Sequence, residues 1–280
     1  MLDKIIDIAD RVRKCTPLVH NITNYVTVND VANAELAIGG SALMADDIAE
    51  VGDMVRIASA VNINIGTLNE RTIVSSIEAA RVANETGTPL VFDPVGAGAS
   101  GLRNETTDDF LEAVKPTVVR GNLSEVSFVA GLDVATKGVD SAVQDEGNDP
   151  VAVAKSVAQS LGCVAAITGA VDVITDGKTV VKVSNGSPLM SKITGTGCMC
   201  DGIIGCFIGV LGPDTTSEDV VAATAGAILS MGLAGELAAG KLHASLGAVP
   251  TGSLHIGIVD ELSLMDGDTY RNHARIEVLR

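Results

Sequence analysis

The chain has 280 residues, of which 46% are hydrophobic, and a formal net charge of −16 at pH 7. This length suits one large α/β domain, and the apolar content excludes extensive disorder. The acidic charge, with no basic stretch, argues against nucleic acid or an anionic membrane as a partner. No apolar run reaches the roughly 18–20 uncharged residues of a membrane span, and the strongest candidate is 202–213. The first residues lack the pattern of a signal peptide, so we expect a cytoplasmic protein.

The five cysteines have no spacing typical of a structural framework. They are Cys15, Cys163, Cys198, Cys200 and Cys206. An odd number in a reducing compartment argues against disulfides. Cys198 and Cys200 form only a C-x-C pair, whereas a zinc site needs a second Cys/His pair at ligand spacing. We expect Cys15, Cys163 and Cys206 to be small buried apolar residues.

The first half of the chain alternates short strands with helices. Apolar residues at helical spacing predict helices over 3–14, 27–38, 71–84, 106–114 and 123–130. Asp46 is expected to cap a further helix that extends to Ala58. Short apolar segments predict strands or extended pieces at 17–24, 41–44, 61–65, 89–93 and 116–120.

The second half begins with a polar segment, 132–149, which we interpret as a surface excursion within one domain spanning 1–280. Pro150 is expected to open a helix to Leu161, since proline suits the first helical turn. Three β segments follow at 164–168, 171–175 and 179–183, and Asp176-Gly177 joins the last two as a hairpin. Further helices are expected over 196–211, 217–240 and about 250–266.

This order of elements predicts an α/β fold with a mainly parallel central sheet and helices on both faces. Ligands of such sheets lie beyond the carboxyl ends of the strands. Five residues that end predicted strands should therefore share one rim: Met44, Gly66, Asp93, Arg120 and Thr168.

Residues 194–202 combine three glycines, two threonines and two cysteines immediately before an apolar run. The first turn of a helix has unpaired N–H donors and a partial positive charge, so it binds anions well. Gly195 and Gly197 would let the backbone approach a ligand closely, with the Cys198 side chain at the mouth of the site. The alternative is a glycine-rich turn before a core helix.

Two further glycine patterns resemble nucleotide motifs without meeting their requirements. Gly96, Gly98 and Gly101 form a G-x-G-x-x-G, but Asp93-Pro94 intervenes after the strand and polar residues 103–105 are expected to precede the helix. A dinucleotide site is therefore disfavoured. Residues 235–242 resemble a P-loop but lack the Ser/Thr after the lysine, so we interpret Gly240 as a helix stop.

Charged side chains at the rim suit a nucleotide site. Asp93 and Glu125 could hold Mg²⁺ directly or through water, and Arg120 could neutralise phosphate oxygens. The alternatives are helix capping for Glu125 and an ion pair with Asp93 or Glu125 for Arg120. For His20 we favour a buried histidine with a satisfied hydrogen bond over a catalytic base.

Seven sequence blocks, taken in order, resemble the hydroxyethylthiazole kinases, a family of the ribokinase-like superfamily. The blocks are 19–26, 41–45, 64–68, 92–97, 120–125, 136–141 and 194–198. The resemblance implies Mg²⁺- and ATP-dependent phosphorylation of the hydroxyl group of 4-methyl-5-(2-hydroxyethyl)thiazole in thiamine biosynthesis or salvage. It also implies a homotrimer with active sites between subunits.

Carried over position by position, the resemblance assigns roles to eight residues. It implies Cys198 and Gly197 at the catalytic centre, Met44 and Gly195 as thiazole contacts, Arg120 and Thr168 as ATP contacts, and Asp93 and Glu125 as carboxylates on the Mg²⁺ side. Cys198 takes the place where many ribokinase-like relatives have an aspartate base. A thiol has an ordinary pKa of about 8.5, which a helix N-terminus would lower.

Two other functions remain open at this point. One is a different ribokinase-like kinase that acts on a pyrimidine or a sugar alcohol. The other is a non-catalytic protein that binds a thiazole or a nucleotide.

Overall fold

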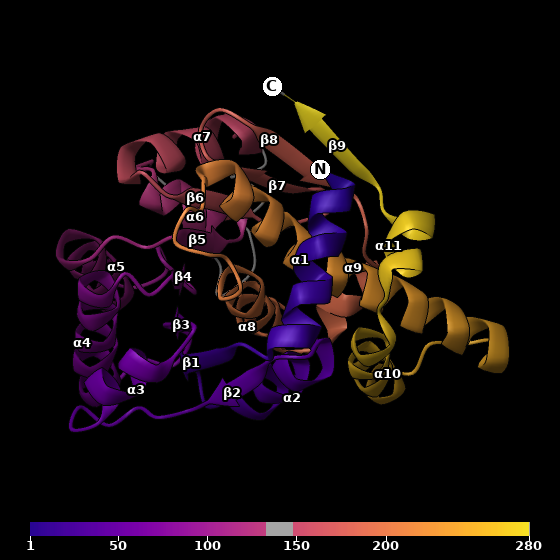
Figure 1. The fold of residues 1–280 in the computed structure, drawn as a ribbon, viewed down its shortest axis with the longest axis horizontal. Coiled ribbons are helices and arrows are strands. Elements are labelled where there is room, and N and C mark those ends of the chain that lie inside the picture. Colours follow the sequence, from indigo (N-terminus) through magenta and orange to yellow (C-terminus); the bar gives the residue numbers. More distant parts are fainter. Residues whose placement is uncertain (133–147, 280) are drawn as a thin grey trace.

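The computed structural model describes residues 1–132 and 148–279, and these form one nine-stranded sheet (Figure 1). The strand order is β2-β1-β3-β4-β5-β6-β7-β8-β9, and the first six strands in this order run parallel. The last three join antiparallel. The strands are β1 (Leu18–Ile22), β2 (Ser41–Leu43), β3 (Ala60–Asn64), β4 (Leu90–Asp93), β5 (Val118–Gly121), β6 (Val164–Ile167), β7 (Asp172–Thr175), β8 (Val180–Val183) and β9 (Ile276–Leu279).

Helices cover both faces of the sheet, as the sequence predicts. Successive strand residues point to opposite faces, so Val91 packs in one core and Phe92 in another. The larger core lies under α1 (Leu2–Cys15), α2 (Val28–Ile38), α8 (Thr196–Ile208), α9 (Ser217–Leu246), α10 (Thr251–Leu264) and α11 (Gly267–His273). The cores of the other face lie under α3 (Val51–Ile57), α4 (Glu70–Thr86), α5 (Gly101–Ala113), α6 (Leu123–Val129) and α7 (Pro150–Leu161).

The longest helix, α9, is a core helix (Figure 1). Residues 220–235 carry no charge, so this helix, and not 202–213, is the strongest apolar segment of the chain. It is the one helix of the described residues that is long and apolar enough to cross a membrane, but 83% of its most apolar window is buried inside the protein. That degree of burial is typical of a helix that packs against its own sheet.

Local signals explain most helix ends. Asn69 forms a capping box with Thr72 at the start of α4, and Gly87 ends that helix in the left-handed region. Pro150 occupies the first turn of α7, as expected. The expected hairpin is also confirmed, because β7 and β8 pair antiparallel across Asp176-Gly177.

Several sequence-based expectations are wrong. Asp46 does not cap a helix: α3 begins at Val51, and Asp46 instead pairs with Arg71 at 2.7 Å. Helix α5 begins at Gly101 with Ser100 as its cap, so residues 103–105 lie inside the helix rather than before it. The first turn of α5 carries polar side chains that are not buried. In sequence such a stretch lacks the apolar spacing of a helix and therefore looks like a loop.

Other sequence-based expectations also differ from the structure. Gly240 does not stop α9, which continues to Leu246 and ends at Gly247. Helix α11 and strand β9 were not expected, since β9 is an edge strand with mostly exposed side chains. Cys15 is exposed rather than buried, whereas Cys163 and Cys206 are buried. Of the polar segment 132–149, residues 133–147 lie outside the described residues, as does the block 136–141.

Candidate active site

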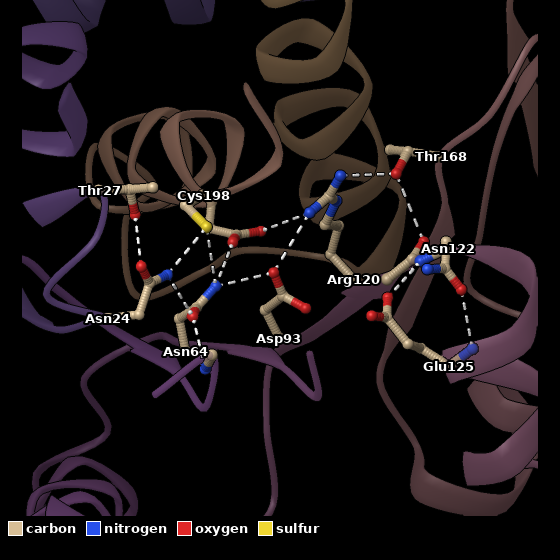
Figure 2. Close-up of polar contacts among 12 residues, drawn as sticks. Asn24, Thr27, Asn64, Asp93, Arg120, Asn122, Glu125, Thr168 and Cys198 are labelled. Atoms are coloured by element: carbon tan, nitrogen blue, oxygen red, sulfur yellow. Dashed lines mark hydrogen bonds and ion pairs between the residues drawn. The ribbon is translucent and has the colours of Figure 1, made fainter. Parts of the chain in front are cut away.

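The rim residues lie at the carboxyl ends of neighbouring parallel strands, and Arg120 contacts two of the others, Asp93 and Thr168 (Figure 2). Its Nη1 donates to Asp93 Oδ2 at 3.2 Å, and its Nη2 donates to Thr168 Oγ1 at 2.6 Å. The ion-pair alternative for Arg120 is therefore confirmed for Asp93. The arginine side chain is 12% exposed, so the guanidinium is nearly enclosed but still reaches a surface.

Asp201 is a partner of this arginine that the sequence did not reveal. It lies in α8, is fully buried, and has Oδ1 3.6 Å from Arg120 Nη1. The Asn64 amide bridges the two carboxyl groups, since its Nδ2 donates to Asp93 Oδ2 at 2.9 Å and to Asp201 Oδ2 at 3.2 Å. Burial raises the pKa of Asp201, and it raises the pKa of Asp93 well above its usual range with help from the charge of Asp201.

Glycines at the start of α8 permit close contacts that a side chain would prevent. Gly195 is in the left-handed region with φ 88°, and a Cβ there would lie 2.6 Å from Thr27 Cγ2. A Cβ on Gly197 would lie 2.7 Å from Arg120 Nη1, so glycine lets the guanidinium rest against the first helical turn. No side chain of the described residues caps this N-terminus, which leaves its N–H groups available to a ligand.

Two cavities meet at this helix start. One, of about 550 Å³, is lined by Arg120 and Thr168 together with apolar side chains of η2 (Pro188–Lys192) and α9, among them Met190, Ile228 and Met231. The other, of about 540 Å³, is lined by residues of five segments: Asn24, Thr27, Gly66, Asp93, Arg120, Glu125, Gly195, Gly197 and Cys198 are among them. Arg120, Ser191 and Thr196 border both cavities.

Cys198 is surrounded by amide groups rather than by cations. Its sulfur accepts hydrogen bonds from Asn24 Nδ2 at 3.1 Å and Asn64 Nδ2 at 3.5 Å (Figure 2). Burial and the negative charges of Asp201 and Asp93 raise the pKa of the Cys198 thiol to about 11. The expected lowering by the helix N-terminus is thus wrong, because desolvation and two carboxyl groups outweigh it.

Glu125 caps a helix and also borders one of the cavities. Its Oε2 accepts from the Asn122 N–H at 2.7 Å in a capping box at the start of α6, which confirms capping. Its Oε1 accepts from the Gly96 N–H at 2.8 Å, and the carboxyl group borders the 540 Å³ cavity. Burial, followed by the charge of Asp93, raises its pKa to about 7.

The remaining sequence candidates are spread around the rim. His20 is buried with Nε2 2.7 Å from the Ala45 oxygen, which confirms a bonded core histidine, although Nδ1 has no partner. Met44 follows the edge strand β2, is half-buried, and is not among the residues that line either cavity of the described chain. Cys200 is buried and borders the 550 Å³ cavity, while Cys198 borders the other.

Asp201, Asn24 and Asn64 carry the polar network, yet none was singled out from the sequence. Asp201 is a single carboxylate within a long apolar helix. That was an available signal, because such a charge is almost never buried without a partner. The two asparagines gave no signal, since asparagine is common where strands end.

Comparison of the sequence with known proteins identifies a family. The model of the hydroxyethylthiazole kinase family matches residues 9–268. A protein of Ruminiclostridium cellulolyticum named hydroxyethylthiazole kinase is 52% identical over 274 residues, covering 98% of this chain and 97% of the relative. One of Clostridium beijerinckii with the same name is 52% identical over 263 residues and covers 93% and 92%.

Solved structures support the same assignment. The hydroxyethylthiazole kinase protein of Pyrococcus horikoshii OT3 is 35% identical with a TM-score of 0.85, covering 99% of each chain. A ribokinase-like superfamily protein of Enterococcus faecalis V583 shares the fold with a TM-score of 0.65 at 14% identity, covering 95% of each chain. The expected ribokinase-like fold is confirmed, and the chain belongs to the hydroxyethylthiazole kinase family.

Proposed function

We propose that this protein transfers the γ-phosphoryl group of ATP to the hydroxyl group of 4-methyl-5-(2-hydroxyethyl)thiazole, in thiamine biosynthesis or salvage. The observation that carries the proposal is the pair of cavities that meet at Arg120, Ser191 and Thr196. A donor and an acceptor placed on either side of that border would meet at the start of α8.

The 550 Å³ cavity suits the nucleotide. Met190, Ile228 and Met231 offer an apolar surface for a base, while Arg120 and Thr168 lie at the border for the phosphates. A nearly enclosed guanidinium strengthens hydrogen bonds to phosphate oxygens. We therefore assign Arg120 and Thr168 to ATP binding.

The 540 Å³ cavity suits the alcohol. Cys198 and the Gly195 segment border it, and the described residues of its walls include no aromatic ring, so aliphatic surfaces would contact the thiazole. We assign Gly195 to substrate binding and Cys198, with Gly197, to the catalytic centre.

Met44 is assigned to the thiazole site of a neighbouring subunit. Within the described residues it lines neither cavity of its own chain. Tyr25 and Val26, close to the alcohol cavity, are 76% and 56% exposed, and Val26 borders that cavity. An apolar rim of this kind suits a partner subunit, and we propose a homotrimer with active sites between subunits.

The residues present suit Mg²⁺. Asp93 Oδ1 is buried and accepts no hydrogen bond from the part of the chain that the structure describes, and the Glu125 carboxyl group borders the same cavity. Carboxylate oxygens are the ligands that Mg²⁺ prefers, usually one or two of them together with phosphates. Asp93 and Glu125 would hold the ion, which would neutralise charge on the phosphates. No group of three or more His, Cys, Asp or Glu side chains gathers as a metal site in the described residues, consistent with an ion that is held largely by the nucleotide.

The chain's own groups would act chiefly by positioning. Phosphoryl transfer has a loose transition state with charge spread over the equatorial oxygens, so electrostatic stabilisation matters more than a strong base. The uncapped N–H groups at the start of α8 and the Arg120 guanidinium would stabilise that charge. Cys198 would orient the attacking alcohol.

A coupled assay for ADP release with hydroxyethylthiazole, ATP and Mg²⁺ tests the proposal. Turnover is expected with this alcohol, and a panel of pyrimidine and sugar alcohols should react far more slowly. Absence of turnover at saturating substrates, with ATP binding retained, would favour the non-catalytic alternative. Faster turnover of another alcohol would favour a different ribokinase-like kinase.

A further inference from the structure

The side-chain amides around Cys198 have a fixed orientation, and this orientation decides what the sulfur can do. Asn64 faces the carboxyl groups of Asp93 and Asp201 with its Nδ2, at 2.9 and 3.2 Å. Its Oδ1 accepts the Gly66 N–H at 3.0 Å. Acceptors on one side and a backbone donor on the other leave only one orientation for this amide.

The orientation of Asn64 determines that of Asn24. Asn64 Oδ1 is an acceptor, so the Asn24 atom 3.0 Å away from it must be the Nδ2 donor. On its other side, Asn24 Oδ1 accepts the Thr27 hydroxyl at 3.0 Å. The two asparagines therefore hold each other in place, as Figure 2 shows.

Asn24 Nδ2 directs its second hydrogen at the sulfur from 3.1 Å, whereas Asn64 Nδ2, whose two hydrogens face the carboxyl groups, lies 3.5 Å from the sulfur. Sulfur is consequently an acceptor toward the protein, and its own hydrogen has to point elsewhere. The pKa of the thiol agrees: burial and nearby carboxyl groups raise it, while the hydrogen bond from Asn24 acts to lower it, as a donor to sulfur does. Cys198 also borders the 540 Å³ cavity, which leaves the cavity side for the S–H group.

We propose that Asn24 and Asn64 are positioning residues that turn the Cys198 S–H toward the alcohol cavity, so that Cys198 donates a hydrogen bond to the hydroxyl oxygen of the substrate. The inference rests on the proposed function for the identity of that alcohol. It assigns the sulfur a role opposite to that of a base, because the thiol gives a hydrogen bond and takes no proton. A loose transition state tolerates this arrangement, since orientation of the attacking oxygen is what it requires.

The direct test is the Raman S–H stretching band of Cys198, identified as the band lost in Cys198→Ser. Addition of hydroxyethylthiazole to the full-length protein should shift this band to lower frequency, with binding followed by calorimetry on the same sample. Binding without a shift, or loss of the band on binding, overturns the inference and leaves the proposed function standing. Absence of binding overturns the proposed function and this inference together.

Asn24→Asp tests the role of the amide, since it replaces the donor with an acceptor of the same shape. The S–H should then point at the new carboxylate, so the ligand-induced shift should disappear and kcat/KM for the alcohol should fall about tenfold. Asn104→Asp is the matched control. Asn104 lies near the start of α5, and its Oδ1 accepts the Gly98 N–H at 2.7 Å, a bond that aspartate keeps. This control should keep both the shift and kcat/KM.

A double-mutant cycle separates positioning from a structural role. In a Cys198→Ala background, Asn24→Asp should lower kcat/KM by less than about twofold, because the group through which it acts is gone. A full tenfold loss in that background would overturn the inference, since Asn24 would then act independently of the sulfur. If Asn24→Asp does not fold, Asn24→Ala removes the same donor without adding charge and carries the same expectations. If neither folds, Asn24 is a requirement of the fold and the inference is withdrawn.

Discussion

Arg120 is a charged side chain that lines both cavities. Its replacement by alanine would leave Asp93 and Asp201 without their cation, and removing one partner of a buried ion pair costs about 3–5 kcal/mol. Arg120→Ala should therefore lower the melting temperature and raise KM for ATP more than Kd for the thiazole. Arg275→Ala removes a surface pair with Glu236 and should cost less than about 1 kcal/mol. A larger loss of thiazole affinity than of ATP use would mean that the cavities are assigned the wrong way round.

Cys198 is expected to help the reaction without being indispensable. With a pKa raised to about 11, its thiol is neutral at pH 7. Serine keeps a hydrogen that can be donated to the substrate, so Cys198→Ser should retain measurable kinase activity in the ADP-release assay. Complete loss of activity at an unchanged melting temperature would contradict this expectation.

Asp172 should make stability depend on pH. It borders the nucleotide cavity, accepts the Gly169 N–H at 2.9 Å, and has a pKa that burial raises to about 7. The folded protein thus binds a proton more tightly than the unfolded chain, and the free energy of unfolding falls as pH rises from about 4 to about 7. Asp172→Asn keeps the acceptor and loses the buried charge. It should raise the free energy of unfolding by about 4 kcal/mol at pH 8 and leave it nearly unchanged at pH 4.

Asp176, at the other end of β7, is the matched control for this measurement. Partial burial acts to raise the pKa of Asp176, but hydrogen bonds from Ser217, Lys178 and Thr179 outweigh it and lower the pKa. Asp176→Asn should consequently destabilise the protein at pH 8, the opposite sign. Thermal melts of both variants at pH 4 and pH 8 give the comparison, and the same sign for both would contradict the assignment.

Among single residues, those that end strands could be predicted, as could Gly197 and Cys198 at the start of α8, whereas Asp201 deeper in that helix was missed. Asp93, Arg120 and Thr168 were identifiable because parallel strands place their carboxyl ends at one edge. Asp201 lies within an apolar helix, and only the packing of α8 on the sheet brings it to Arg120. The pKa of Cys198 was predicted in the wrong direction because burial, and then the carboxyl groups of Asp201 in α8 and Asp93 in β4, raise it, and these effects depend on how α8 packs on the sheet.

At the scale of elements, two glycines of α9, Gly232 and Gly240, should have opposite effects on stability when each is replaced by alanine. A Cβ on Gly232 would lie 2.6 Å from the Asn185 backbone oxygen, in the segment that lines the nucleotide cavity. Gly232→Ala should therefore cost about 1–3 kcal/mol and raise KM for ATP. Gly240 has nothing within 4 Å of its Cβ position, so Gly240→Ala should stabilise the helix by about 1 kcal/mol. Chemical denaturation of the two variants measures both values, and a loss of stability for both would contradict this account.

Element positions could be predicted from periodicity, and several element ends could not. The parallel strands β1 to β6 were found because they are short apolar runs between helices. The start of α5 was missed because its cap, Ser100, belongs to a glycine-rich loop. The end of α9 was missed because Gly240 resembles a stop, although the helix packing around α9 continues past it. Strand β9 depends on pairing with β8, a contact between segments far apart in sequence.

At the scale of the whole molecule, we expect an assembly of three chains. Sedimentation equilibrium should give three times the mass of 28.5 kDa. Met44→Ala should raise KM for the thiazole several-fold while KM for ATP changes little, because Met44 would contact the thiazole of a neighbouring chain. A monomeric protein with full activity would contradict both the trimer and the role of Met44. The single domain over 1–280 and the cytoplasmic location stay predictions.

The common border of the two cavities has a consequence for ligands. Arg120, Ser191 and Thr196 line both cavities, so the two cavities adjoin at these residues. One molecule that joins a thiazole alcohol to a nucleoside polyphosphate would reach across this border into both cavities. Its two halves would gain from effective concentration, because binding of either half holds the other beside its own cavity. Such a conjugate should bind more tightly than either substrate alone.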